Sequence, residues 1–167
     1  MFATPKVVVR TVLFAVSLAT ASLTVAHGPV VKAEVGLTTV VPEARGAAAT
    51  VDAFHVALKS GDARAASALL ADDVLIYESG EVERSKAEYA AHHLTADIEF
   101  TKAVPATVTR RAGRSVGTMA WIASEGRTTG NFNGRPIDVA TTETMVLQRV
   151  GKAWRIVQIH WSSAKAR

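Results

Sequence analysis

The sequence contains no cysteine, which excludes disulfides, thiolate catalysis and thiolate metal sites. It is also poor in aromatic residues (6%) and in charged residues (20%), while 49% of its 167 residues are hydrophobic. This balance is typical of one globular domain and not of a disordered chain. Without disulfides such a domain is held together by packing, and a domain of this length is large enough for that.

Clusters of basic side chains are missing as well, since no run of Lys or Arg is longer than Arg110-Arg111. Binding to a phosphate backbone needs clustered basic groups, so we do not expect a nucleic-acid partner. The formal charge of +4 includes Lys6 and Arg10. Without these two of the 19 basic residues, 17 basic and 15 acidic residues remain, a balance of +2.

The one long uncharged run lies near the N-terminus, from Thr11 to Ala26, and follows Lys6 and Arg10. A basic start, an apolar centre and an exit of small residues predict a signal peptide over residues 1–26. Cleavage after Ala33 is a second possibility, and an uncleaved anchor is the alternative to both, although a span needs about 20 apolar residues. We therefore expect a periplasmic or secreted protein, with no membrane association once the leader is removed.

Residues 27–43 contain Gly, Pro and β-branched residues without a sustained period, and we expect a flexible arm there. The domain itself is predicted over residues 44–163, followed by a short tail, 164–167. Its first half reads as three helices. The apolar residues Ala47, Val51, Phe54 and Leu58 share one helical face.

Cap signals mark the next two helices. Ser60-Gly61-Asp62 ends the first helix and caps a second, short one. Ser85 and Glu88 have the spacing of a capping box, and predict a third helix to about Asp97.

The remaining chain reads as strands. A short strand over 74–77 is followed, after the third helix, by strands over 100–111, 114–126, 137–148 and 154–161. Pro105 makes the first of these an edge or bulged strand, and Asn133-Gly134 is a two-residue hairpin signal. Three helices gathered on one face of a curved antiparallel sheet predict an α+β fold, a cone-shaped α+β roll.

Three stretches then resemble a known family, the SnoaL-like members of the nuclear transport factor two-like superfamily, which also contains ketosteroid isomerase. They are Phe54 with Ser60-Gly61-Asp62 and the run from Leu69 to Val74, the hairpin Asn133-Gly134-Arg135-Pro136, and the ending Trp154-Arg155-Ile156-Val157 with His160-Trp161-Ser162. The resemblance covers roughly residues 44–163. It implies the cone-shaped, cystatin-like fold with a pocket between sheet and helices, but not one function, because this scaffold hosts many chemistries.

Alternation along the strands predicts which side chains face that pocket. On the last strand Trp154, Ile156, Gln158 and His160 share one face, and Arg155, Val157, Ile159 and Trp161 share the other. Glu143 shares a face with Met145 and Leu147, and Glu78 shares one with Ile76. A carboxylate and an imidazole among apolar neighbours suit an acid–base site, so Glu78, His160 and Glu143 are the candidate catalytic residues. Each also has a non-catalytic interpretation. Glu78 would be a solvated residue at a strand end, Glu143 would face solvent or pair with an arginine across the sheet, and His160 would be a hydrogen-bonded core residue.

The resemblance to ketosteroid isomerase implies roles for three positions. Glu78 falls where that family has its proton-shuttling carboxylate, and Glu143 falls near its acidic hydrogen-bond donor. The phenolic donor falls at Phe54, which cannot donate a hydrogen bond. In ketosteroid isomerase these two donors form the oxyanion hole. Half of it is therefore missing here, which argues against steroid isomerisation by the same catalytic groups.

The candidate ligand-binding residues are Tyr77, Tyr89, His93, Trp121 and Trp154. His93 and Asp97 are one helical turn apart and could share a metal ion with Glu78 or His160 as a third ligand, but two residues alone are a weak signal. We therefore expect no metal and no cofactor.

Two functions remain open at this point. The first is binding of a small, mostly apolar molecule in the cone pocket, or a role as a dimeric accessory module. The second is a cofactor-free isomerase or dehydratase-type enzyme with Glu78 as general base. A homodimer is expected through the outer sheet face, where Trp161, Val157 and Ile159 are predicted to lie.

Overall fold

The computed structural model describes residues 39–166. The predicted signal peptide, and most of the predicted arm, lie outside these residues and stay predictions. Within residues 39–166 no helix is both long and apolar enough to cross a membrane. The helical and strand elements are η1 (Pro42–Ala44), α1 (Arg45–Ser60), α2 (Ala63–Leu69), β1 (Leu70–Glu78), β2 (Glu81–Glu83), α3 (Lys86–His92), α4 (Leu94–Ala103), β3 (Ala106–Val116), β4 (Met119–Phe132), β5 (Arg135–Val150) and β6 (Ala153–Lys165).

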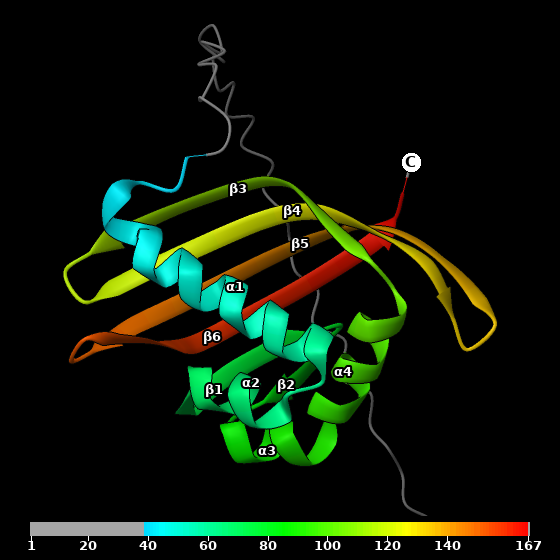
Figure 1. Cartoon of the computed structure of the whole chain (residues 1–167), viewed down its shortest axis with the longest axis horizontal. Helices are drawn as coiled ribbons and strands as arrows, with labels where there is room; N and C mark the ends of the chain where they lie inside the picture. The colour runs from blue at the N-terminus through cyan, green and yellow to red at the C-terminus, as the bar shows by residue number, and fades with distance from the viewer. Residues whose placement is uncertain (1–38, 167) are drawn as a thin grey trace, which may run out of the picture. The chain divides into compact units, whose positions relative to one another are not determined.

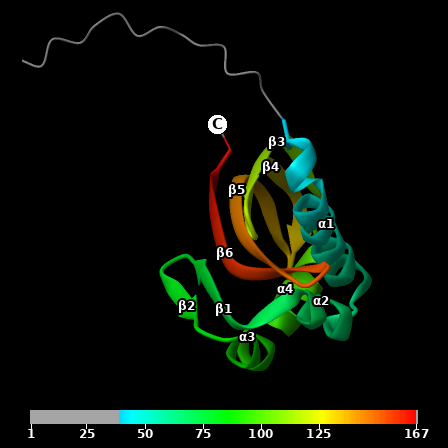
Figure 2. The same ribbon diagram turned by 90° about the vertical axis from the view of Figure 1, so that its left-hand side faces the viewer.

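The six strands form one curved sheet in the order β2-β1-β6-β5-β4-β3, and α1 lies across its concave face (Figures 1 and 2). The neighbouring strands are antiparallel except for β1 and β6, which run parallel. The α+β roll predicted from the sequence is thus confirmed, with one parallel pair in a sheet that was expected to be antiparallel throughout.

The predicted apolar face of the first helix forms the centre of the core. Ala47, Val51 and Phe54 are fully buried, and Leu58 is 3% exposed. On the sheet side, Ile122, Met145, Leu147, Ile156 and Ile159 pack against this face with no exposed area. Burial of side chains of this size contributes about 1.5–3 kcal/mol each to stability, which is what keeps a cysteine-free domain folded.

The local signals placed most helix ends correctly. Gly61 ends α1 in the left-handed region, with φ of 82°, and Asp62 caps α2 by accepting a hydrogen bond from the backbone N–H of Ala65. Ser85 caps α3 by accepting from the N–H of Glu88. The Asn133-Gly134 turn has positive φ at both residues, as its hairpin geometry requires.

Several predicted boundaries are wrong. The third helix is broken at His93 into α3 and α4, and α4 continues through Phe100 to Ala103, where a strand was expected. β3 and β4 meet in a turn at Gly117, inside the single strand predicted over 114–126. The end of the predicted arm is also attached to the domain, since the N–H of Val41 donates to the carbonyl of Gly113 at 3.1 Å.

The most consequential difference is a β-bulge in β6. Val146 pairs with Gln158 and Leu147 pairs with Ile156, so Val157 is an extra residue without a partner on β5. A bulge of one residue exchanges the two faces of the strand beyond it. Ile159 and Trp161 therefore face inward and His160 faces outward, the reverse of the alternation predicted from the sequence.

Candidate functional site

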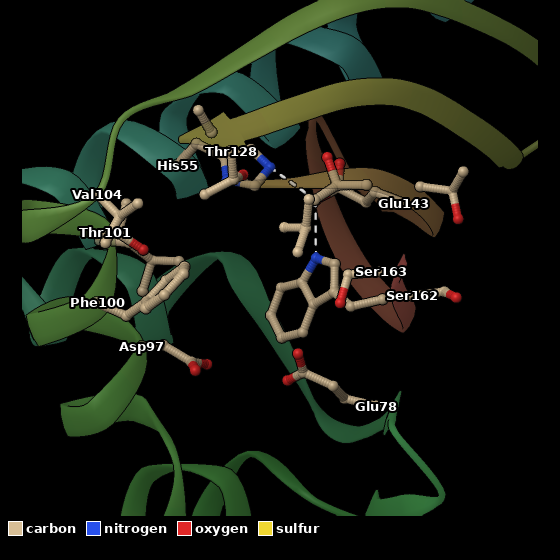
Figure 3. Close-up of a pocket in the computed structure, with 16 residues that line it drawn as sticks. His55, Glu78, Asp97, Phe100, Thr101, Val104, Thr128, Glu143, Ser162 and Ser163 are labelled. Atoms are coloured by element: carbon tan, nitrogen blue, oxygen red, sulfur yellow. Dashed lines mark hydrogen bonds and ion pairs between the residues drawn. The ribbon is translucent and has the colours of Figure 1, made fainter. Parts of the chain in front are cut away.

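A pocket with several polar groups lies on the inner side of the sheet, between β5, β6, α1 and α4 (Figure 3). Its volume is about 250 Å³. Its walls include the apolar side chains of Leu58, Phe100, Val104 and Val139. This is the cone pocket that the fold predicted, and it has space for a ligand of one or two rings, given that a cavity of about 150 Å³ accommodates benzene.

Glu143 of β5 is the central polar group of the pocket. Its side chain is only 11% exposed, and its Oε2 atom accepts two hydrogen bonds, each 2.8 Å long, from Nε2 of His55 and from the indole Nε1 of Trp161 (Figure 3). The other oxygen, Oε1, is buried and has no hydrogen-bond partner. One half of this carboxylate is therefore fixed by the protein, and the other half is free to accept a hydrogen bond.

The surroundings of Glu143 keep it ionised. Burial alone would raise its pKa, but the hydrogen bond and charge of His55, the bond from Trp161 and the charge of Arg111 outweigh burial and lower the pKa. Arg111 is itself held by Asp52, with Nη1 and Oδ1 2.5 Å apart. Glu143 is consequently an acceptor at neutral pH and not a proton donor.

Secondary structure explains why these three side chains meet. Trp161 and Glu143 are direct partners in the β5–β6 register, and the bulge at Val157 turns Trp161 inward. Phe54 lies under the indole in a stacked arrangement, with ring centroids 6.4 Å apart. His55 is the next residue of α1, at the border of its buried face, and so reaches the carboxylate from the helix side.

Two more carboxylates line the opposite end of the pocket. Glu78 at the end of β1 and Asp97 on α4 both border this pocket and also a second cavity of about 210 Å³ (Figure 3). Burial, then the charge of Asp97, raises the pKa of Glu78, against a smaller opposing effect of His93. Burial likewise raises the pKa of Asp97, although the hydrogen bond from Tyr89 and the charge of His93 oppose it.

Tyr89 and His93 belong to the second cavity. Tyr89 is 1% exposed and donates its hydroxyl to Oδ2 of Asp97 at 2.6 Å. Burial and the neighbouring Asp97 raise its pKa, so the phenol stays protonated. His93 pairs through Nδ1 with Glu83 and lies 3.1 Å, through Nε2, from Glu81. His93 and Asp97 are thus each engaged by a different neighbour.

Four predicted site residues lie outside these cavities. His160 and Tyr77 are exposed, and their register pairing places them side by side on β6 and β1. Trp121 is 38% exposed on β4, while Ala120 and Ile122 on either side of it face the core. Trp154 packs against the core beside Gly46, under the guanidinium of Arg149. The prediction of His160 as an acid partner in the pocket is wrong, because the bulge turns it to the outer face.

His55 and Trp161 were missed as site residues. His55 was not among the candidates, and Trp161 was assigned to the outer face. The position of His55, one residue after the buried Phe54, was the available signal for the first. No signal in the sequence marked the bulge that moves the second.

Comparison with known proteins agrees with this architecture. A family model described as a SnoaL-like domain matches residues 47–166. A solved structure of a candidate ketosteroid isomerase from Shewanella frigidimarina is 37% identical to the chain, with a TM-score of 0.68, and the match covers 70% of this chain and 94% of that one. No curated protein sequence matches significantly.

Two further solved structures are similar in fold. A candidate calcium/calmodulin-dependent protein kinase II association domain from Xanthomonas campestris is 23% identical, with a TM-score of 0.63, covering 76% of this chain and 94% of that one. A candidate dehydratase of the nuclear transport factor two-like family from Streptomyces avermitilis is 18% identical, with a TM-score of 0.64, and the match covers 74% of this chain and 97% of that one. Likenesses at this level of identity carry the fold and nothing more.

Proposed function

The chain belongs to the SnoaL-like domain family, and on that basis we propose that its cone pocket binds a small, mostly apolar molecule carrying one hydrogen-bond donor. The observation that carries this proposal is the buried Oε1 atom of Glu143, which has no hydrogen-bond partner. Leaving a buried acceptor unsatisfied costs about 1–3 kcal/mol, and more for a charged group. A ligand hydroxyl or N–H placed at Oε1 would recover that free energy.

The remaining features of the pocket support this choice of ligand. Its apolar walls favour a hydrocarbon body, and a few fixed polar groups then decide orientation, which is the usual composition of small-molecule sites. Glu143 is held in place by His55 and Trp161 before any ligand arrives, so little conformational entropy is lost on binding.

Calorimetric titration with two ligands of nearly equal shape tests the proposal. 2-Naphthol carries a hydroxyl donor, and 2-methoxynaphthalene does not. The native chain should bind 2-naphthol at least about tenfold more tightly, because a hydrogen bond to a charged acceptor contributes about 1.5–3 kcal/mol. Equal affinities for the two compounds would contradict the proposal.

The matched variants are Glu143→Gln and Glu99→Gln. In Glu143→Gln the carbonyl oxygen takes the bonds from His55 and Trp161, so the amide NH₂ replaces the acceptor Oε1 and the preference for 2-naphthol should disappear. Glu99 is exposed on α4 and outside the cavities, so Glu99→Gln should keep the native preference. A preference that survives in Glu143→Gln would show that the donor is recognised elsewhere.

A second candidate function is proton-transfer catalysis on a carbonyl compound, with Glu78 as general base and Asp97 as the protonated partner. The observation in its favour is that both carboxyls border one pocket and have raised pKa values, as acid–base catalysts require. The relative described as a candidate ketosteroid isomerase is consistent with it. The test is NMR measurement of deuterium exchange at the α-carbon of 2-tetralone. We expect the native chain to accelerate this exchange above its rate in buffer and Glu78→Gln to lose the acceleration. Exchange at the buffer rate with the native chain would rule out proton-transfer catalysis on this ketone.

We further propose that the outer sheet face forms a homodimer. The register places Leu75, Gln158, Val146 and Trp121 in one row across four strands. Leu75, Tyr77 and Trp121 are each more than a third exposed on that face. Of the three residues first expected there, Ile159 and Trp161 face inward instead and Val157 lies in the bulge, so the proposed contact surface consists of a different set.

A further inference from the structure

A second buried carboxylate lies on β2, away from the cone pocket's central group. Glu83 is 5% exposed, and its Oε1 atom pairs with Nδ1 of His93. Its Oε2 atom is buried and has no hydrogen-bond partner. A buried carboxylate oxygen left in this way points to a partner that the protein itself does not supply.

The side chains next to this oxygen are metal-ligand types. Glu88 and His92 lie one turn apart on α3, and ligand atoms of Glu83, Glu88 and His92 all lie within 4.8 Å of one another. Nδ1 of His92 is 3.5 Å from Oε2 of Glu83. Two ligands of a tetrahedral ion, each bonded at about 2.0–2.1 Å, are about 3.4 Å apart, so this separation fits one shared ion.

We propose that Glu83, Glu88 and His92 bind a divalent first-row transition metal, with Zn²⁺ as the best fit. One imidazole and two carboxylates suit Zn²⁺, whereas Mg²⁺ and Ca²⁺ prefer oxygen ligands alone. Three protein ligands leave a fourth position for water. The side chain of His92 is 60% exposed, so this position is reached from solvent.

The neighbouring hydrogen bonds hold the proposed ligands in place. His93 fixes one oxygen of Glu83, and the backbone N–H of Arg84 donates to Oε2 of Glu88 at 2.6 Å. Partners of this kind orient metal-ligating carboxylates. The ion would join the edge strand β2 to α3, at the side of the second cavity that Glu83 lines.

The competing explanation is an ion pair between Glu83 and a protonated His92, without any metal. The two explanations differ in what Zn²⁺ does to the protein. In the proposed site one equivalent of Zn²⁺ binds and raises the unfolding temperature, because an ion that binds only the folded state stabilises it. In the ion pair, Zn²⁺ leaves the unfolding temperature unchanged.

The experiment is calorimetric titration of the full chain with ZnCl₂ after EDTA treatment and dialysis, followed by thermal unfolding with and without Zn²⁺. The native chain should bind one equivalent, with millimolar Mg²⁺ giving no competition. His92→Gln and Glu83→Gln should each weaken binding at least about tenfold and remove the rise in unfolding temperature. With Co²⁺ as a probe, the visible absorption of a four-coordinate site should develop in the native chain and be lost in His92→Gln and Glu83→Gln.

Two matched controls change the same residue types elsewhere. His160→Gln and Glu99→Gln replace exposed side chains outside the proposed site and should bind Zn²⁺ as the native chain does. If Glu83→Gln fails to fold, His92→Gln still decides, since His92 is exposed. The proposal is wrong if the native chain does not bind Zn²⁺ at 100 μM, or if binding is equally strong in His92→Gln.

Discussion

Nε2 of His55 on α1 and Oε2 of Glu143 on β5 lie 2.8 Å apart, and this contact joins the long helix to the sheet at one end of the pocket. On the sheet side it is continued by Trp161, which donates to the same oxygen. The three residues form one network, so removing any of them changes the environment of a carboxylate that is only 11% exposed.

Replacement of His55 should therefore destabilise the fold. In His55→Ala, Glu143 keeps its charge but loses one of two donors, and we expect the free energy of unfolding to fall by about 1–2 kcal/mol, allowing for the partial exposure of His55. Urea unfolding followed by Trp fluorescence measures this. His160→Ala changes an exposed histidine and should stay within about 0.5 kcal/mol of the native chain. Equal effects of the two substitutions would mean that the contact with Glu143 contributes little.

Asp97 should make stability depend on pH in the opposite sense from an ordinary carboxylate. Its pKa in the folded state is raised, mainly by burial, among Tyr89, His93, Glu83 and Glu78. Between the unfolded pKa and this raised value the folded state holds a proton that the unfolded state has released. The contribution of Asp97 to stability is then lost as pH rises through that window.

Asp97→Asn removes this titration and keeps an acceptor for the Tyr89 hydroxyl. Its free energy of unfolding relative to the native chain should therefore increase from pH 4 to pH 7. Unfolding curves at several pH values, recorded in EDTA, give this difference. A difference that is constant with pH would show that Asp97 titrates normally.

The proposed dimer depends on the exposed row that contains Trp121. Trp121→Arg places a charge at the β4 end of that row and should yield a monomer, with stability changed by less than about 1 kcal/mol, because the side chain is 38% exposed in the single chain. Size-exclusion chromatography with light scattering gives the mass. Val150→Arg, at an exposed position next to the β5–β6 turn, is the control that should leave the dimer intact. A native chain that is already monomeric at micromolar concentration would contradict the proposal.

The sequence predicted the fold and most helix ends, because these depend on local chemistry: Asp62 and Ser85 cap helices, Gly61 ends one, and Asn133-Gly134 forms a hairpin. It also predicted correctly that Glu143 shares a face with Met145 and Leu147. It failed where geometry depends on the partner strand. The bulge at Val157 is defined by the register with β5, and the alternation of apolar residues in β6 contains no sign of it. Glu143 was therefore predicted without His55 and Trp161, which together with Arg111 lower its pKa.

The extra residue in β6 also affects how relatives should be compared. In a protein of the same fold without this bulge, the fourth residue after the counterpart of Ile156, which aligns with His160, would face the pocket. In the present chain that place is taken by Trp161. An alignment that runs through Val157 without a gap would therefore equate a pocket-facing residue with a solvent-facing one, and a family motif should be transferred along this strand by facing direction.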